Sequence, residues 1–243
     1  MSIDGQHQHL IFDADDTLWE NNVHFEHAIE DFLDFLDHST LTREEARAVL
    51  DEIELANAGA GGYGSAAFTR NLRLCYEHLA EKHIADADLR TVMAFGERIL
   101  SQPIELIAGV EATLARLAPR HDLTLMTKGH PEEQRLKIDR SGLGGYFRHA
   151  AVVPEKDPAA YRTLVARLEL EPARSWMIGN SPKSDVNASL AAGLNAVYIP
   201  HHATWRLEEQ EIKGDVGPGR LLVLERFPDL ERHFLDDIDA LSG

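Results

Sequence analysis

The amino-acid sequence predicts an α/β protein with a parallel-sheet core and a block of helices inserted after the first strand. From residue 104 onward, short apolar segments alternate with amphipathic segments, an order typical of right-handed βαβ units. Residues 19–104 show helical periodicity without a strand pattern, and a single apolar segment precedes them. We therefore expect a core domain formed by residues 1–18 and 105–243 and a four-helix domain formed by residues 19–104.

The first strand is predicted at residues 9–12, a short apolar run that suits a strand buried on both faces. Four helices should follow it. Apolar residues recur at three- and four-residue spacing in residues 25–36, 46–53, 68–79 and about 87–100. Thr42 and Glu45 form a capping-box pattern before the second helix. Residues 58–65, AGAGGYGS, are expected to be a loop, because glycine disfavours a helix interior.

The remaining helices and strands alternate along the chain. Helices are expected at residues 110–117, 131–141, 158–168 and 186–192. Strands are expected at residues 122–127, 148–153, 175–179, 195–199 and 220–224, ahead of a charged C-terminal segment. Segments of these lengths build βαβ units, so the strands should run in parallel and end at one common edge.

The composition restricts the kinds of partner. With 24 basic and 41 acidic side chains the net charge is −17, which argues against nucleic acid or an anionic membrane surface as the main partner. The single cysteine, Cys75, can form no intrachain disulfide, and no segment has the pattern of a signal peptide or a transmembrane helix. We expect a cytoplasmic protein, monomeric or homodimeric, that acts on a small molecule.

Three aspartates, Asp13, Asp15 and Asp16, follow the first predicted strand within four positions. Ligands bind at the carboxyl ends of strands in open α/β sheets, and carboxylates crowded there need a cation or a proton. Asp13 could attack an electrophile while Asp15 delivers and later removes a proton. A turn or a helix cap would need only one Asp or Thr, so the group indicates a catalytic site. Asp16 and Thr17 are expected to shape the following turn.

Further polar groups follow other predicted strands. Thr127 could hydrogen-bond a substrate oxyanion, although threonine is common in strands. Lys156 stands before a helix N-terminus, where a cation opposes the helix dipole, so we interpret it as a partner of the carboxylates, with a solvated lysine as the alternative. In residues 179–185, GNSPKSD, Asn180 and Asp185 offer hard oxygen ligands for magnesium. Asp185 as the N-cap of the next helix is the alternative.

Together these groups resemble the motifs of the haloacid dehalogenase-like (HAD) hydrolase superfamily, in its phosphatase branch. DADDT at residues 13–17 corresponds to the first motif, Thr127 to the second, Lys156 to the third and GNSPKSD to the fourth. The resemblance implies a Rossmann-like core with a helical cap. It also implies that Asp13 is a nucleophile that forms an aspartyl-phosphate and that Asp15 is the general acid/base.

The resemblance further implies how phosphate and metal would be bound. Thr127 and Lys156 would bind the transferred phosphoryl group. Mg²⁺ would be held by Asp13, the main-chain carbonyl of Asp15, and the fourth-motif residues Asn180 and Asp185. The commonest pattern has an aspartate where Asn180 stands, so we expect weaker metal binding. Two further residues are candidates for substrate binding: Lys128 and, in the glycine-rich loop, Tyr63.

The leading hypothesis is a magnesium-dependent phosphatase that acts on a small phosphorylated metabolite. A 2-haloacid dehalogenase would need the nucleophile but no acid, since halide leaves unaided, so Asp15 favours phosphoryl chemistry. A non-enzymatic phospho-ligand-binding module on the same fold is an alternative from another class. A signalling receiver domain would be much shorter and would lack the helical insertion. The pair His201 and His202 is expected to lie at the surface.

Overall fold

The structure, a computed structural model, describes residues 7–214 and 217–235, without the side chains of residues 59–61. The chain divides into two compact units, one formed by Met1–Glu20 with Ile104–Gly243 and the other by Asn21–Pro103. The division falls one or two residues from the expected limits of the helical insertion. That the second unit acts as a cap stays a prediction.

The described part of the first unit contains a six-stranded sheet in which every pairing is parallel. Its strands are β1 (His9–Phe12), β2 (Asp122–Lys128), β3 (His149–Val153), β4 (Ser175–Gly179), β5 (Asn195–Tyr198) and β6 (Leu221–Val223). Their order is β3-β2-β1-β4-β5-β6, so the chain builds the sheet in one direction from β1 to β3 and in the other from β4 to β6. In open α/β sheets ligands bind where the direction changes, which here is at the carboxyl ends of β1 and β4. The predicted Rossmann-like α/β fold is confirmed.

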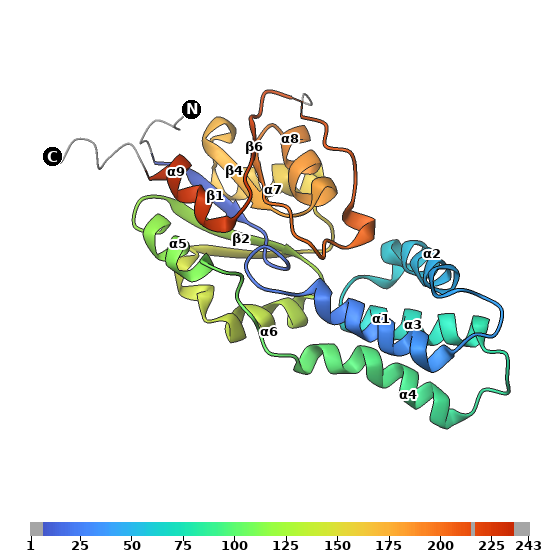
Figure 1. Ribbon diagram of the computed structural model, residues 1–243. Helices are drawn as coiled ribbons and strands as arrows, with labels where there is room; N and C mark the ends of the chain where they lie inside the picture. Colours follow the sequence, from blue (N-terminus) through green and yellow to red (C-terminus); the bar gives the residue numbers. More distant parts are fainter. Residues whose placement is uncertain (1–6, 215–216, 236–243) are drawn as a thin grey trace. The chain divides into compact units, whose positions relative to one another are not determined.

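The central strands are buried on both faces of the sheet, and successive residues of a strand point to opposite faces. Leu10 and Phe12 belong to the apolar core on one face, and Ile11 belongs to the core on the other. Helices α5 (Val110–Leu117) and α9 (Leu230–Phe234) pack on the first face, and α7 (Pro158–Leu168) and α8 (Ala188–Ala191) on the second (Figure 1). Burial on both sides is why the strands read as continuous apolar runs.

Two helices of this unit differ from their predicted form. The helix expected at residues 186–192 begins earlier, because η4 (Pro182–Asn187), a π-helical turn, leads directly into α8. Pro182 suits a first helical position, where its missing N–H has no partner to lose. The charged C-terminal segment contains α9, which was not predicted. Its five residues are too few to show a helical period, and Leu230 and Phe234 are buried.

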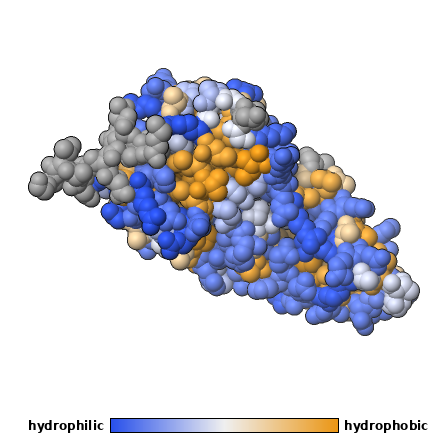
Figure 2. All heavy atoms as spheres, turned by 45° about the horizontal axis from the view of Figure 1, so that its top comes forward, coloured by the Kyte–Doolittle hydropathy of each residue, from blue (hydrophilic) through white to orange (hydrophobic). Residues whose placement is uncertain are grey.

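The other helices of the first unit agree with the sequence. Helix α6 (Pro131–Ser141) begins at the expected proline, as does α7. Short helical turns complete the connections: η2 (Leu143–Tyr146), η3 (Pro172–Arg174), η5 (Arg206–Glu208) and η6 (Phe227–Asp229). None of the described helices is both long and apolar enough to cross a membrane. On the face drawn in Figure 2, hydrophilic residues surround several areas of hydrophobic ones.

The second unit is helical throughout. It contains α1 (Asn22–Leu36), α2 (Arg43–Gly61), α3 (Ser65–Leu79), α4 (Asp86–Glu97) and the short η1 (Arg98–Ser101). The capping box is present: Thr42 Oγ1 accepts from the Glu45 N–H at 3.2 Å, and the Glu45 carboxylate accepts from the Thr42 N–H at 2.8 Å. The four helices enclose a separate apolar core that includes Phe32, Leu50 and Leu72.

The prediction of a loop over residues 58–65 is wrong in its first half, because α2 continues to Gly61. Each glycine costs a helix only about 1 kcal/mol relative to alanine, and every residue added to an existing helix gains a backbone hydrogen bond. The helix stops at Gly62, whose φ of 73° lies in the left-handed region that favours glycine. Tyr63 is half-buried in the short link that follows.

Candidate active site

The predicted site residues of the core unit meet at the carboxyl edge of the sheet. The Asp13 N–H donates to the Ile178 carbonyl at 2.9 Å and so extends the pairing of β1 with β4 by one residue. Thr127 lies near the end of β2, Lys156 follows β3, and Asn180 follows β4. The four strands deliver these residues to one edge because they are parallel and adjacent. This edge contains the switch in strand order.

Lys156 is the cation at the centre of the site. Its Nζ forms ion pairs with Asp13 and, at 2.8 Å, with Asp185 Oδ1, and all three residues are buried. Although burial alone would lower it, the pKa of Lys156 is raised by Asp13 and Asp185. One ammonium group thus faces two carboxylates. The alternative of a solvated surface lysine is excluded.

The carboxylates carry more negative charge than Lys156 neutralises. Burial raises the pKa of Asp13 to about 7, against the lowering effect of Lys156 and with a further contribution from Asp185. A buried oxygen-rich group with excess negative charge suits a hard divalent cation. The donors present therefore fit magnesium: Asp13, Asp185, the Asn180 side-chain oxygen and the main chain at Asp15.

Local features at the end of β4 and just after it determine the position of Asp185. The N-cap is Ser181, whose hydroxyl accepts from the Ser184 N–H at 2.8 Å, so the alternative of Asp185 as N-cap is wrong. The Ser181 N–H donates to Asp185 Oδ2 at 2.9 Å. A Cβ atom at Gly179 would lie 2.4 Å from Asp185 Cγ, which explains the glycine that ends β4. The carboxylate is thereby turned back toward Lys156.

Thr17 contacts two of the predicted site residues, Asp13 and Asn180, which its predicted role in the turn did not include. Its hydroxyl lies 3.2 Å from Asp13 Oδ2 and 3.2 Å from Asn180 Oδ1. The amide nitrogen of Asn180 donates to Thr204 Oγ1 at 3.2 Å. Asn180 thus presents its oxygen toward the Thr17 hydroxyl, which also contacts Asp13, an orientation compatible with a metal ligand.

Asp15 faces a different set of partners from Asp13. Its carboxylate accepts from Trp19 Nε1 at 2.8 Å, Gln134 Nε2 at 2.9 Å and Lys137 Nζ at 3.0 Å. Burial by itself would raise the pKa of Asp15, but the Lys137 charge and these hydrogen bonds outweigh it, so the pKa lies below its ordinary value. The tight turn that brings Trp19 back includes Asp16, which has a φ of 61°.

The predicted substrate-binding residues have distinct surroundings. The Thr127 hydroxyl donates to Gln134 Oε1 at 3.1 Å. Lys128 forms ion pairs with Glu155 and with Glu208, and Glu208 also accepts from the Ser181 hydroxyl at 2.6 Å. Tyr63 belongs to the helical unit. Its binding role and that of Lys128 stay predictions.

Sequence analysis missed several side chains around the site. Gln134 and Lys137 lie on α6, where the apolar period indicates a helix but not the direction of its polar side chains. Glu208 lies in a connection after β5 without a recognisable motif. One sequence signal could have drawn attention to α6: the helix follows the strand that contains Thr127, and it carries Gln134 and Lys137 at a spacing of three residues.

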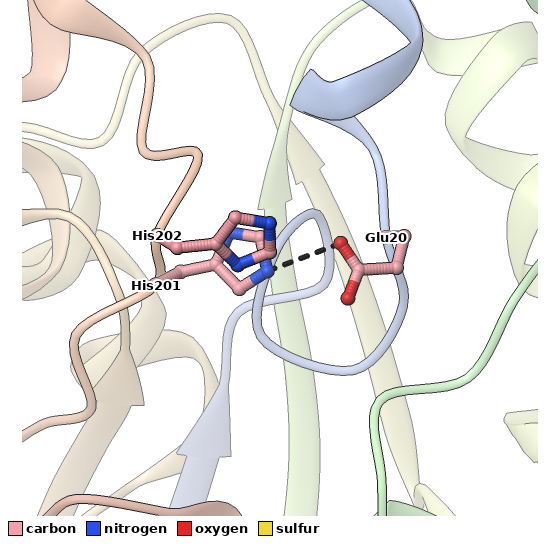
Figure 3. Close-up of side chains that lie close together, drawn as sticks. All are labelled: Glu20, His201 and His202. Atoms are coloured by element: carbon pink, nitrogen blue, oxygen red, sulfur yellow. Dashed lines mark ion pairs between the residues drawn. The ribbon is translucent and has the colours of Figure 1, made fainter.

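Of the two histidines expected at the surface, His202 is exposed, but the His201 side chain is only 9% exposed. It forms a cluster with Glu20 and His202 whose potential ligand atoms lie within 4.8 Å of one another (Figure 3). His201 Nδ1 accepts from the Ala203 N–H at 3.3 Å, and Nε2 lies 3.1 Å from the Glu20 carboxylate. Burial lowers the pKa of His201, so the neutral ring carries its proton on Nε2, facing Glu20. We interpret the cluster as a structural contact between residue 20 and the loop after β5.

The raised pKa of Asp13 predicts how the stability of the metal-free protein depends on pH. Between its ordinary value of 3.8 and about 7, folded Asp13 keeps a proton that the unfolded chain loses, so the free energy of unfolding should fall as the pH rises through this interval. Urea unfolding in EDTA at several pH values measures the slope. The variant Asp13→Asn should lack this contribution; equal slopes in the two proteins would contradict the assignment. Asp15, whose pKa is lowered, changes the free energy of unfolding only at pH values below this interval.

Fold and site together define a Rossmann-like hydrolase with paired carboxylates at the switch point of its sheet. The haloacid dehalogenase-like hydrolase family matches residues 7–193, and the chain belongs to this family.

Known proteins differ in how similar they are to this chain in sequence and structure. A haloacid dehalogenase-like hydrolase from Xanthomonas campestris has 30% identity and a TM-score of 0.78, with 95% of this chain and 96% of that chain covered. A 2-haloacid dehalogenase from Pseudomonas syringae pv. Tomato has 20% identity, coverage of 93% and 96%, and a TM-score of 0.59, which shows the shared fold alone. A phosphoserine phosphatase from Thermus thermophilus is 29% identical over 104 residues, 41% of each chain. The match thus spans less than half of that enzyme.

Proposed function

We propose that this protein is a phosphatase that hydrolyses a small phosphorylated metabolite through an aspartyl-phosphate on Asp13. The observation that carries the proposal is the presence of two carboxyl groups with separate partners on one loop. Asp13 contacts Lys156, whereas Asp15 is bound by donors from Trp19 and α6. A nucleophile and a separate acid/base suit an ester whose leaving oxygen needs a proton.

The reaction would proceed in two displacements. An Asp13 oxygen attacks phosphorus, the bond from phosphorus to the leaving oxygen breaks, and that oxygen takes a proton from the protonated form of Asp15, which the lowered pKa makes the minor form near neutral pH. A water molecule then attacks phosphorus and passes a proton to Asp15, and the bond between phosphorus and Asp13 breaks. Lys156 and Thr127 lie at the same edge of the sheet as Asp13 and would donate to the phosphoryl oxygens, where negative charge gathers.

We infer that magnesium is the metal of this site. Asp13, Asp185, the Asn180 oxygen and the Asp15 carbonyl would hold it. The bound ion would offset the charge of the carboxylates and of the substrate phosphate. The pKa of about 7 for Asp13 in the metal-free fold supports this, because an ionised nucleophile at neutral pH then requires a further positive charge.

A 2-haloacid dehalogenase is the second candidate, because a carboxylate nucleophile such as Asp13 would serve that chemistry as well. That chemistry would use Asp13 and leave Asp15 without a proton to transfer, since halide departs unprotonated. The partial similarity to a phosphoserine phosphatase supports phosphate esters as the substrate class.

A substrate panel tests the proposal. The purified protein is incubated with p-nitrophenyl phosphate and with phosphorylated amino acids, sugars and nucleotides, and phosphate release is measured with Mg²⁺ and with excess EDTA. We expect turnover that EDTA abolishes and Mg²⁺ restores. Halide release from 2-chloropropionate is measured in parallel. Halide without phosphate would overturn the proposal in favour of a dehalogenase, and turnover of neither class would favour a phospho-ligand-binding module. The variant Asp13→Asn corrects for contaminating phosphatases.

A further inference from the structure

The Asp15 carboxylate is bound at both oxygens by side chains that the sequence motifs do not include. Lys137 Nζ lies 3.0 Å from Oδ1 and 3.0 Å from Oδ2, so it bridges the two. Trp19 Nε1 donates to Oδ1, and Gln134 Nε2 donates to Oδ2. Each oxygen therefore receives one neutral donor and shares the ammonium group. These contacts determine the direction in which the carboxylate points.

Lys137 is directed at Asp15 by its position on α6. Gln134 and Lys137 are three residues apart and so share one face of that helix, and the Lys137 side chain is 12% exposed. The Glu133 carboxylate, one helical turn earlier, lies 3.9 Å from Lys137 Nζ. The contacts to Asp15 are shorter and involve both oxygens. A surface lysine without a structural target would not be held in this way.

The same helix connects Asp15 with Thr127. Gln134 accepts from the Thr127 hydroxyl at 3.1 Å while its nitrogen donates to Asp15, so one amide bridges a proposed phosphate ligand and the proposed acid/base. Gly129 makes room for this amide: a Cβ atom there would lie 2.8 Å from Gln134 Nε2, and its φ is 147°. Strand end, glycine and helix thus form one support for Asp15.

We propose that Lys137 is a positioning residue that fixes the orientation of the Asp15 carboxylate for proton transfer to the leaving group. The inference rests on the proposed phosphatase function. Asp15 can protonate a leaving oxygen only from a restricted range of positions, and small displacements of a catalytic group reduce rates strongly. Without Lys137, each oxygen keeps a single neutral donor and the carboxyl group can turn about its own bond. Loss of the Lys137 charge would also raise the pKa of Asp15 and favour its acid form, so a lower rate with an alkyl ester would report lost orientation and not a lost proton. Lys137 itself exchanges no proton in this scheme.

Two esters that differ in leaving group distinguish positioning from a general structural role. We compare kcat/KM, which covers the steps through phosphorylation of Asp13, for p-nitrophenyl phosphate and for the best alkyl phosphate of the panel. Nitrophenolate leaves without a proton, whereas an alkoxide needs Asp15. Lys137→Met should lower kcat/KM for the alkyl ester by about 10- to 100-fold, less than the roughly 10²- to 10⁴-fold that complete loss of a general acid costs, and should change kcat/KM for the nitrophenyl ester much less. Lys137→Arg, which keeps charge and two donors, should restore most of the loss.

Arg135→Met is the matched control, because it removes the same charge from an exposed position of α6. This variant should leave kcat/KM unchanged for both esters. Equal losses for both esters in Lys137→Met, or no loss, would overturn the positioning role. If Lys137→Met does not fold, Lys137→Gln, which keeps one donor, should show the same difference between esters at a smaller size, and equal effects there would likewise overturn it. Failure of the wild-type protein to hydrolyse either ester would instead contradict the proposed function.

Discussion

Replacement of Asp13 by asparagine is expected to lower the turnover of phosphate esters by at least about 10³-fold, as removal of a nucleophile does in other covalent hydrolases. An amide oxygen is too weak a nucleophile to displace the leaving group. The fold should persist, since asparagine has nearly the shape of aspartate and its oxygen can still accept from Lys156. Rates of phosphate release, with far-UV circular dichroism and urea unfolding for the fold, measure both effects.

Asp139→Asn is the control for this substitution, because Asp139 is an exposed aspartate of α6. It should retain full activity. Acid-quenched wild-type protein should carry phosphate on the peptide that contains Asp13, and the variant should not. Substantial turnover by Asp13→Asn would identify another nucleophile and reject the two-displacement reaction. In EDTA above about pH 7, the variant should be at least as stable as the wild type, because it removes a buried charge that Lys156 only partly offsets.

Most of the sheet is predictable because its strands are apolar on both faces and are separated by helices with clear limits. Asp13, Thr127, Lys156 and Asn180 could be assigned to one edge before their contacts were known, since parallel adjacent strands end together. The glycines near residue 60 wrongly indicated a loop in α2. A capped N-terminus and several alanines stabilise the helix as far as Gly61. Residues in a five-residue helix such as α9 show too little periodicity to be recognised.

The surroundings of the site depend on features that a sequence pattern does not contain. The direction of Lys137 depends on the rotation of α6 about its axis, and Gln134 is placed by the glycine at 129. Glu208 reaches Lys128 from the short helical turn η5, which has no recognisable sequence motif. Sequence left open whether Asp185 is a cap or a ligand. The Ser181 hydroxyl takes the cap position and so removes that alternative, while metal binding by Asp185 stays a prediction.

Substitution of Lys156 by methionine is expected to remove activity and to destabilise the metal-free protein. Lys156 is the ammonium group that faces both Asp13 and Asp185, and all three are buried. Removal of one partner from a buried ion pair typically costs about 3 to 5 kcal/mol, because the remaining charge loses its compensation. The loss of unfolding free energy should be largest above about pH 7, where Asp13 would otherwise ionise, and smaller at about pH 5, where it keeps its proton.

Lys183→Met is the matched control, since Lys183 is an exposed lysine two residues before Asp185. A double-mutant cycle separates the charge interaction from loss of packing. In the Asp13→Asn background one of the two carboxylates is already neutral, so Lys156→Met should cost less there than in the wild type. The difference between the two costs measures the coupling between Lys156 and Asp13. Equal costs in both backgrounds would mean that Lys156 stabilises the fold by packing or through Asp185 alone, and the role of Lys156 in holding the nucleophile ionised would have to be abandoned.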